Sequence, residues 1–406
     1  MKKLKPIALA LLAGIVILNS CKDDEAAIPQ YKLNLTTVGQ GGIDLNPEQE
    51  KYHAGTELTL TAIPANGWMF QTWSGDVSST DNPLTLTVDS EKSITATFTE
   101  KDLYLAENGI TIIAGEHTIV GQDYELDGVM YTVVDNLLLY YKAERDEDLT
   151  KVVTTKVTEM GSLFSSKQTF NQDISSWDVS NVSNMAGMFN QNRVFNQDIS
   201  AWDVSKVTSM RSMFTGCHAF NQPIGSWNVS SVNDLSFMFN DAIIFNQDIS
   251  SWNVSNSTSF TAMFQQAYEF NQPIGNWDVS KATSFSHTFG NAQAFNQDIS
   301  NWNIESATST HGMFYNARAF NQDISNWNLS NVRATSHMFW NATAFNQNIS
   351  GWNTDNVTTM KKMFYNALDF NQDLSQWTVE KVGDCEDFAT NTPDWKKPKP
   401  NFTNCN

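Results

Sequence analysis

The sequence has few of the residues that usually build catalytic and metal sites. Its 406 residues include four cysteines and six histidines, and the histidines are scattered at 53, 117, 218, 287, 311 and 337. His287 and His337 hold equivalent positions of a repeat described below, but two repeats at strand spacing separate them by roughly 10 Å, whereas a zinc ligand bond is about 2 Å long. A phosphate-binding glycine loop, a nucleophile elbow and a Cys-x-x-Cys pair are also missing from the sequence. We therefore expect no enzyme, no metal and no other cofactor.

Positive charge is scarce as well. The chain has 25 Lys and Arg residues against 44 Asp and Glu residues, which gives a net charge of −19. Nucleic-acid binding needs a basic face, so we expect no nucleic-acid partner. An acidic surface that keeps the protein soluble is the simplest interpretation, and an acidic site for a basic partner is the alternative. Aromatic residues make up 12% of the chain, which is enough for a packed core and argues against general disorder.

Long apolar runs are limited to one, at residues 7–18, which follows Lys2 and Lys3. This run is short for a membrane span and predicts a signal peptide over residues 1–20. The run ends in Leu18-Asn19-Ser20-Cys21, which resembles a bacterial lipobox, although Asn is an unusual middle residue. The resemblance implies cleavage before Cys21 and acylation of that cysteine. An ordinary secretory signal followed by an incidental cysteine is the alternative.

Residues 21–30 are predicted to form a tether behind this anchor. Lys22-Asp23-Asp24-Glu25 resembles the export signal of some Gram-negative surface lipoproteins. The resemblance implies a lipid-anchored protein that faces outward from the outer membrane, and a plain polar linker is the alternative. Burying acyl chains contributes about 0.8 kcal/mol per CH₂ group, so several chains anchor stably where one does not.

Most of the chain consists of a 25-residue sequence repeat that occurs nine times. Its first copy contains Phe170-Asn171-Gln172-Asp173-Ile174 and then Trp177-Asp178-Val179. A fixed period of 20–50 residues predicts a solenoid, a propeller or an array, and a propeller blade needs 40 or more residues. The repeated tryptophans stand at 177, 202, 227, 252, 277, 302, 327, 352 and 377.

The spacing inside each copy predicts the kind of solenoid. Ile174, Trp177 and Val179 follow the leucine-rich-repeat frame, and Trp177 and Val179 would point to one side of a short strand. Val182, Met185 and the following Met188-Phe189 are spaced by three and four residues, as on one face of a helical or 3₁₀ turn. We therefore expect a leucine-rich-repeat-like solenoid over residues 160–384, with one strand and one short helical turn per coil.

The repeated phrase Phe-Asn-Gln-Asp-Ile-Ser-x-Trp-Asp-Val-Ser closely resembles the BspA-like leucine-rich-repeat surface-protein family. The likeness covers more than half of the chain. It implies a bacterial surface adhesin or binding protein. Because the ligands of that family differ, it does not imply a particular ligand.

Residues 31–100 follow a different pattern. Apolar residues alternate with Thr in 58–62 and 93–98, as they do in half-buried strands, and Gly and Pro mark turns between them. The run from Ala62 through Trp68 to Trp73-Ser74-Gly75-Asp76 resembles the divergent internalin B-repeat family. This resemblance implies a small β-rich module. Trp68 and Trp73 are expected in its core, with an exposed ligand face as the alternative.

Caps are expected at both ends of the solenoid, because a repeat stack exposes apolar surface at each end. Residues 101–159 lack the 25-residue period and contain three β-branched or aromatic runs, at 110–113, 129–134 and 137–141, so they predict a β-rich N-terminal cap. Residues 385–406 break the repeat and predict the C-terminal cap. Cys385 and Cys405 are expected to form a disulfide there, since two cysteines near the end of an exported chain commonly pair.

Two polar columns accompany the apolar ones. The Asn171 column is expected to form an amide ladder beside the buried Phe, and an exposed ligand column is the alternative. The column after Trp alternates with buried residues and is therefore expected on the concave, ligand-binding face of the solenoid. A merely solvated face is the alternative. The predicted ligand-binding residues are Asp178, Asp203, Asn228, Asn253, Asp278, Asn303, Asn328 and Asn353.

Three functions fit these predictions. The first is adhesion of a monomeric surface lipoprotein to an extracellular protein of a host or neighbouring cell. The second is binding of a surface glycan, and the third is a structural spacer without a specific ligand. Exposed repeat tryptophans would favour the glycan, because sugars stack on aromatic faces, and buried ones would favour the other two.

Overall fold

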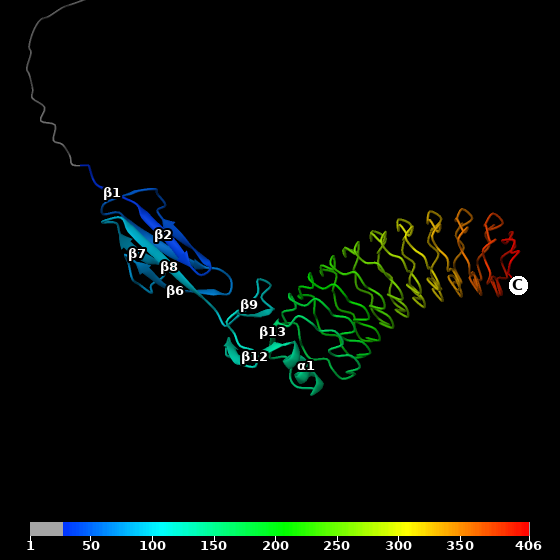
Figure 1. Ribbon diagram of the computed structural model, residues 1–406, viewed down its shortest axis with the longest axis horizontal. Helices are drawn as coiled ribbons and strands as arrows, with labels where there is room; N and C mark the ends of the chain where they lie inside the picture. Colours follow the sequence, from blue (N-terminus) through cyan, green and yellow to red (C-terminus); the bar gives the residue numbers. More distant parts are fainter. Residues whose placement is uncertain (1–26, 406) are drawn as a thin grey trace, which may run out of the picture. The chain divides into compact units, whose positions relative to one another are not determined.

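Residues 27–405 are described by a computed structural model (Figure 1). The predicted signal peptide and Cys21 lie outside the described residues. The described chain divides into two compact units, one with residues 27–65 and 70–99, the other with residues 66–69 and 100–405. In the part of the chain that the structure describes, no helix has the length and apolar character needed to span a membrane.

The first unit is built from short strands with alternating burial. In the strand Glu57–Pro64, Leu58, Leu60 and Ala62 are buried while the residues between them are not, as the alternation predicts. The strands form sheets in the orders β2-β8-β6, β3-β5-β7 and β1-β4. Their bounds are β1 Gln30–Tyr31, β2 Leu33–Val38, β3 Gly41–Asn46, β4 Tyr52–His53, β5 Glu57–Pro64, β6 Trp68–Gly75, β7 Leu84–Thr87 and β8 Lys92–Glu100.

Tryptophan 73 is the centre of this first unit. Trp73 is fully buried, and its indole Nε1–H donates to the carbonyl oxygen of Asp81 at 2.9 Å. A buried indole needs such a partner for its N–H. Trp68 is only half-buried, so the core position expected for both tryptophans holds for Trp73 alone.

The second unit begins with a small β-rich region ahead of the repeats. Strand β12 lies between β11, which is antiparallel to it, and β13, which is parallel to it. Its apolar residues Val133 and Val134 are buried. The bounds are β9 Leu103–Leu105, β10 Ile112–Ala114, β11 Asp123–Leu126, β12 Val129–Asp135 and β13 Val152–Lys156, and β9 pairs with β10.

One prediction for this region is wrong: residues 137–141 are helical and not a strand. They belong to α1, Asn136–Glu144, whose N-cap Asp135 accepts the backbone N–H of Leu138 at 2.9 Å. The run of Leu and Tyr has no polar alternation, and Leu, Lys, Ala and Glu all favour helix. Leu139 and Ala143, four residues apart, are buried, whereas Leu137 is 79% exposed.

The repeats form a stack of coils joined by backbone hydrogen bonds, called here the coil stack (residues 160–384; Figure 1). One segment of each coil makes most of these bonds, and we call residues 184–191 and their equivalents the ladder segment. The N–H groups of Met185, Gly187 and Phe189 donate to carbonyls 24 residues later at 3.0, 2.8 and 3.0 Å. Each coil thus pairs with the next one, which a single coil could not do alone.

The strand and helical turn predicted for each coil are not present in the described repeats. Instead, each coil is a series of turns closed by bonds between residues three apart, such as Trp177 N–H to the Ile174 carbonyl at 3.1 Å and Val182 N–H to the Val179 carbonyl at 2.9 Å. β-structure is limited to isolated parallel bridges such as Asn184 with Ser209. Consecutive turns bury apolar residues at the same spacing as a strand followed by a helical turn would. The spacing therefore does not distinguish these two conformations.

The interior of the coil stack is aromatic and continuous. Consecutive tryptophans such as Trp202 and Trp227 lie with ring centroids 6.5 Å apart and nearly parallel. The ring centroid of Phe189 lies 5.6 Å from that of Phe214 in the next coil. It lies 3.9 Å from that of Phe195, in the turn that follows Phe189 in the chain. Burial of such rings is the main favourable contribution to folding here.

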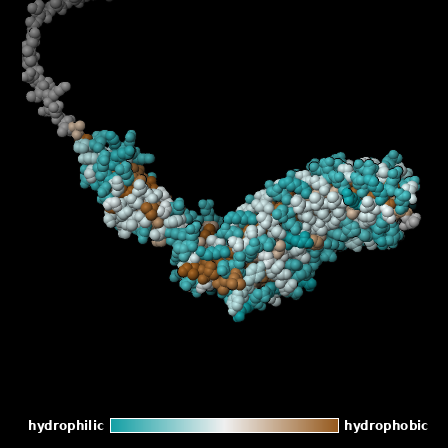
Figure 2. All heavy atoms as spheres, viewed as in Figure 1, coloured by the Kyte–Doolittle hydropathy of each residue, from teal (hydrophilic) through white to brown (hydrophobic). Residues whose placement is uncertain are grey.

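The surface of the second unit is not uniform. Ile119, Val120, Met130 and Leu137 are exposed apolar residues of the region before the repeats. Figure 2 shows that the coil stack itself is mostly hydrophilic or neutral on the face drawn. Exposed apolar residues are therefore concentrated in the N-terminal region of this unit, while the repeats expose single ones such as Val194 and Leu368.

Candidate binding surface on the coil stack

The predicted ligand-binding column has a structural task. Each of its Asp and Asn side chains accepts, through Oδ1, the backbone N–H of the residue two positions later, for example Asp203 from Ser205 at 3.0 Å and Asn303 from Glu305 at 3.0 Å. This is an Asx turn, which only Asp and Asn make well. The same bond occurs at Asp178, Asn228, Asn253, Asp278, Asn328 and Asn353.

These side chains are nevertheless at the surface in most coils. Asp203 and its later equivalents are exposed, while Asp178 in the first coil is only 4% exposed. Hydrogen bonds from the Ser280 side chain and backbone lower the pKa of Asp278. The restriction to Asp and Asn thus has a local cause, namely the turn, and does not require a ligand.

The second polar column is an amide ladder, as expected. Asn171 Oδ1 accepts the backbone N–H of Asn196 at 2.9 Å, and Asn196 Oδ1 accepts that of Asn221 at 3.0 Å. The neighbouring glutamines add rungs, with Gln197 Nε2 donating to the Asn171 carbonyl at 3.0 Å. Each amide satisfies backbone groups of the adjoining coil, so this column belongs to the scaffold.

The repeated tryptophans do not face solvent. They are 0–4% exposed, and each indole N–H donates to a carbonyl of the preceding coil, as Trp277 does to Ile249 at 3.2 Å. They cannot offer a stacking surface to a sugar. Their column is fixed by packing and by this hydrogen bond.

Other columns change from coil to coil, some of them outside the ladder segment, such as that of Arg193, and some within it. We call three of them the variable face: the columns of residues 186, 187 and 190. The 190 column changes from Asn, Thr and Gln in the early coils to aromatic residues in later ones. The members of this column are Asn190, Thr215, Asn240, Gln265, Gly290, Tyr315, Trp340, Tyr365 and Thr390.

Aromatic side chains form a continuous row on this face. The ring centroid of Trp340 lies 5.3 Å from that of Tyr315 and 5.1 Å from that of Tyr365. Lys362 Nζ lies 5.1 Å from the Trp340 ring centroid, within the range of a cation–π contact. All three aromatic residues are half-buried, so part of each ring is accessible. We call Tyr315, Trp340 and Tyr365 the aromatic row.

Three histidines accompany the aromatic row. His311 lies between His287 and His337, with ring centroids 4.9 and 5.0 Å away, and His337 lies 5.1 Å from Trp340. His287 and His337 share a column, as predicted, but His311 belongs to the neighbouring column and fills the coil between them. No group of three or more possible metal ligands occurs in residues 27–405.

These histidines are held in the neutral form. Burial lowers the pKa of all three, and it is assisted at His287 by the neighbouring His311. At His337, burial and then His311, His287, Lys362 and Lys361 lower the pKa to about 4. Nδ1 of His287 is buried without a hydrogen-bond partner among the described residues.

The backbone under the variable face is unusual. The 187 column has a positive φ in every coil, from 52° to 64° where the structure gives it, and glycine occupies it in two coils. Bulky residues at such φ values cost roughly 1–2 kcal/mol relative to the ordinary helical region. Phe237, His287, His337 and Lys362 nevertheless occupy it. Backbone strain of this kind clusters at functional positions.

A groove lies at residues that follow the aromatic row in the chain. Two adjoining hollows of about 420 and 650 Å³ share Asn366 and Leu368. Asn341 and Asn366, which directly follow Trp340 and Tyr365 in the chain, line the groove. We call it the side groove, and its lining residues are Arg318, Asn341, Thr343, Asn366, Leu368, Ala389, Asn391, Thr392, Pro393 and Lys399.

The charged residues that line the side groove are basic, whereas the chain as a whole is acidic. The only charged lining residues of the groove are Arg318 and Lys399. Within the described chain, neither forms an ion pair within 4.0 Å, although Lys399 lies over the Trp395 ring at 5.1 Å. In a protein of net charge −19, two cations without carboxylate partners make this groove a local positive site.

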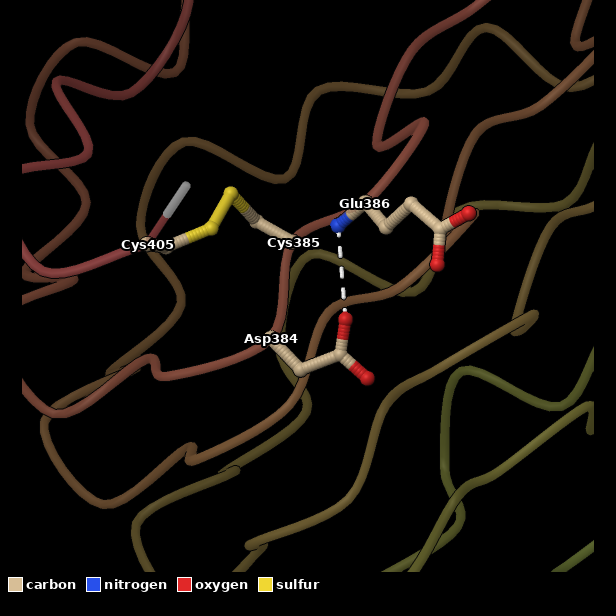
Figure 3. The surroundings of a disulfide bond; sticks show 4 residues. All are labelled: Asp384, Cys385, Glu386 and Cys405. Carbon is tan, nitrogen blue, oxygen red and sulfur yellow. Dashed lines mark hydrogen bonds between the residues drawn. A yellow bond between two sulfur atoms is a disulfide. The ribbon is translucent and has the colours of Figure 1, made fainter.

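The cysteines occupy the places predicted for them where they are described. Cys385 and Cys405 are joined by a disulfide that spans 20 residues (Figure 3). Beside it, Asp384 Oδ1 accepts the backbone N–H of Glu386 at 3.4 Å. Cys217 is a free, buried thiol in a column otherwise filled mostly by Ala, and burial raises its pKa above the usual range.

The sequence analysis missed the aromatic row and the side groove. Tyr315, Trp340 and Tyr365 each follow the buried Met-Phe pair of their coil, so within one coil they look like a continuation of the apolar core. Writing the nine copies under one another at a period of 25 would have revealed an aromatic run in a polar column. Arg318 stands in a column that also contains Arg193, and only the structure places it at a groove.

Comparison with known proteins assigns most of the chain. The family described as "Mycoplasma protein of unknown function, DUF285" matches three overlapping stretches, residues 135–243, 222–325 and 297–402. The family described as "Divergent InlB B-repeat domain" matches residues 31–102, as the resemblance of the first module implied. The repeats thus match DUF285, while the likeness to the BspA-like family stays an expectation. No curated protein and no solved structure matches the chain.

Proposed function

Because the chain belongs to the family described as "Mycoplasma protein of unknown function, DUF285" and carries a divergent InlB B-repeat domain, we propose that it is a cell-surface adhesin. In this proposal the coil stack presents the variable face to an extracellular partner. The chain acts by binding and not by catalysis. The divergent InlB B-repeat domain is a domain type of surface proteins, and its presence beside the repeats supports the cell-surface location. The following observations support the binding role.

The contrast between columns carries the proposal. The tryptophan, Asx-turn and amide-ladder columns keep nearly the same residue in all nine coils, and each has a structural contact that explains it. The variable face lies on the same rigid coils but changes in size, charge and aromatic character. A stack that acted only as a spacer would not need such differences between coils. A surface that binds a specific ligand would need them.

The anchor in this proposal is the acylated Cys21, with residues 21–30 as a tether and the protein facing outward from the outer membrane. Cys21→Ser should abolish acylation and release the protein from membranes, because the thiol is the proposed acylation site. Metabolic labelling with a fatty acid checks this. Label kept by the variant would contradict the lipid anchor, while leaving the binding role of the repeats open to its own test.

Binding is tested with the whole chain on arrays of extracellular-matrix proteins and glycans, followed by attachment of intact cells. The expected result is saturable binding that is lost when the aromatic row is changed. The matched control is Tyr268→Ala, which removes an exposed aromatic side chain that lies outside the variable face. Equal loss in both variants, or no binding to any protein, glycan or cell, would contradict the proposal.

Glycan binding is favoured over protein adhesion by one observation. The repeated tryptophans are buried, as a protein ligand or no ligand would predict, but Trp340 belongs to a second set of aromatic residues that is accessible. The lining of the adjoining groove is rich in amides and hydroxyls, with Leu368 as its largest apolar side chain. The partner class is therefore taken up separately below.

A further inference from the structure

We propose that the aromatic row and the side groove together bind an acidic polysaccharide, a chain of pyranose rings that carry carboxylate or sulfate groups. The inference rests on the proposed function and names its ligand class. It is carried by three observations about neighbouring side chains: the spacing of the rings, the amides beside them and the unpaired cations of the groove.

The aromatic row repeats with the coils. Its centroids are 5.3 and 5.1 Å apart, so Tyr315, Trp340 and Tyr365 form a line along the stack. A line of evenly spaced rings suits a linear polymer whose units repeat, because each unit meets the same surroundings as the one before. Accessible parts of Tyr and Trp rings can pack against the C–H faces of sugars, while Tyr hydroxyls remain free to hydrogen-bond.

Amide groups run parallel to this line. Asn316 Nδ2 donates to Asn291 Oδ1 at 2.8 Å, and Asn341 Nδ2 donates to Asn316 Oδ1 at 2.7 Å. Each Asn in this column has a positive φ of 55–61°, a conformation that Asn tolerates better than most residues. From Gln266 onward, the column therefore presents one amide per coil. Because an amide both donates and accepts, it can bind vicinal hydroxyls of successive sugars.

The cations select the charge of the ligand. Arg318 and Lys399 line the side groove without a carboxylate among the lining residues. An Arg guanidinium binds a carboxylate or sulfate through two parallel hydrogen bonds. The net charge of −19 makes non-specific attraction of polyanions weak, so an acidic chain would bind only where the local charge is positive.

This chemistry fits a sugar chain better than a protein segment. A protein interface of this size would place large apolar side chains at its centre, whereas the groove offers Leu368 and otherwise amides, hydroxyls and small residues. The polar lining instead matches a ligand that is covered by hydroxyl groups.

Binding of defined oligosaccharides to the whole chain tests the proposal by calorimetry. The probes are galacturonate and hyaluronan oligomers with carboxylates, heparin oligomers with sulfates, and neutral cellohexaose and chitohexaose. The test variants are Trp340→Ala and Arg318→Gln. Their controls are Tyr268→Ala and Arg193→Gln, which make the same kinds of change at exposed residues outside the variable face and the side groove. Thermal melting of all four variants checks that they are folded.

The expected result is binding of an acidic oligomer that weakens about tenfold or more in each test variant and stays within about twofold of the parent in each control. Arg318→Gln should also reduce the dependence of affinity on salt. Preference between the carboxylated and sulfated probes identifies the anionic group.

Three outcomes overturn the proposal. Binding of the neutral probes alone removes the role of the cations, and equal losses in test and control variants place the site elsewhere. Binding to a protein that depends on Trp340, with no glycan bound, rejects the ligand class but leaves the adhesin function intact. Absence of any partner on glycan, protein and cell arrays rejects both.

Discussion

The fixed columns and the variable face of the coil stack lie on the same coils but differ in what determines their residues. A fixed column such as that of Trp277 is buried and hydrogen-bonded to the preceding coil in the same way nine times. The variable face lies on the ladder segment, where backbone bonds join the coils and the side chains are not needed for pairing. Regularity in this protein therefore indicates structure, and irregularity indicates where function is to be sought.

The same comparison changes the interpretation of the exposed Asp and Asn column. Exposure and polarity suggested a ligand strip, but Asp203 and its equivalents each hold a backbone N–H of their own coil. The aromatic row has no such repeated contact, because its neighbours differ in every coil. An exposed residue is thus a candidate for binding only after its local contacts have been considered.

The largest expected effect is the loss of a fixed aromatic residue. Trp277→Ala should lower the free energy of unfolding by roughly 3–5 kcal/mol, because it leaves a cavity and removes the indole bond to Ile249. Trp340→Ala, on the variable face, should cost about 1 kcal/mol, as for other half-exposed positions. Denaturant unfolding monitored by circular dichroism compares them. Equal costs would mean that the aromatic row is part of the core.

The next effect concerns the C-terminal end of the stack. Cys405→Ala opens the loop of 20 residues closed by Cys385, which should cost roughly 3 kcal/mol in the chain-entropy model. The control is Cys217→Ala, since Cys217 is a free thiol in a column otherwise filled mostly by Ala. Thermal melting with and without reductant checks both. A parent protein whose melting is unchanged by reduction would contradict the expected stabilisation.

A smaller effect is expected for one Asx turn. Asp278→Ala removes the acceptor of the Ser280 N–H at 3.0 Å and should cost about 0.5–1.5 kcal/mol. Asp278→Asn keeps the acceptor and should cost much less. Adhesion should be the same in both variants, because the column is structural. Loss of adhesion in a folded Asp278→Ala protein would restore this column as a ligand site.

The smallest effect is a dependence of stability on pH. The folded state lowers the pKa of His287, His311 and His337, so it binds fewer protons than the unfolded state. Stability should therefore fall as the pH drops from about 6.5 toward about 4, the value at His337. The effect is modest because these side chains are only half-buried and solvent screens them.

Replacing the three histidines by Gln gives the control for this dependence. The variant should melt at a temperature that changes less over the same pH window, measured by scanning calorimetry. Hydrogen bonds from the serine two residues later lower the pKa of Asp278, Asp298 and Asp323, so the stability that these carboxylates contribute is lost only at lower pH. An unchanged slope between pH 6.5 and 4 in the variant would show that other groups cause the loss.

Much of the architecture could be predicted from the sequence because it repeats. The period, the buried Trp and Phe columns and the Asn171 ladder follow from identical residues at fixed spacing, each of which needs the next coil for burial or hydrogen bonds. The conformation within a coil could not be predicted, since turns at Trp177 and Val182 bury the same spacing as a strand and a helix. The helix α1 was missed because its Leu-rich run was compared with strand patterns while its cap, Asp135, was overlooked.

The candidate binding surface was harder to predict for a different reason. The aromatic row and His311 form a cluster only because stacking brings together residues about 25 positions apart in the chain. No short sequence motif predicts this cluster. The side groove depends on the shape of four successive turns of the stack around Asn366. Sequence spacing specifies which residues share a column, but it does not specify which columns remain open to a ligand.

One experiment tests most directly the claim that fixed columns fold the protein and the variable face binds. The aromatic row is replaced by the residues that earlier coils carry in the same column: Tyr315→Thr, Trp340→Asn and Tyr365→Asn. Melting and partner binding are then measured on the same protein. Because Asn190, Thr215 and Asn240 already occupy that column in folded coils, we expect a melting temperature within a few degrees of the parent and loss of binding. A folded protein that binds as well as the parent would contradict the account.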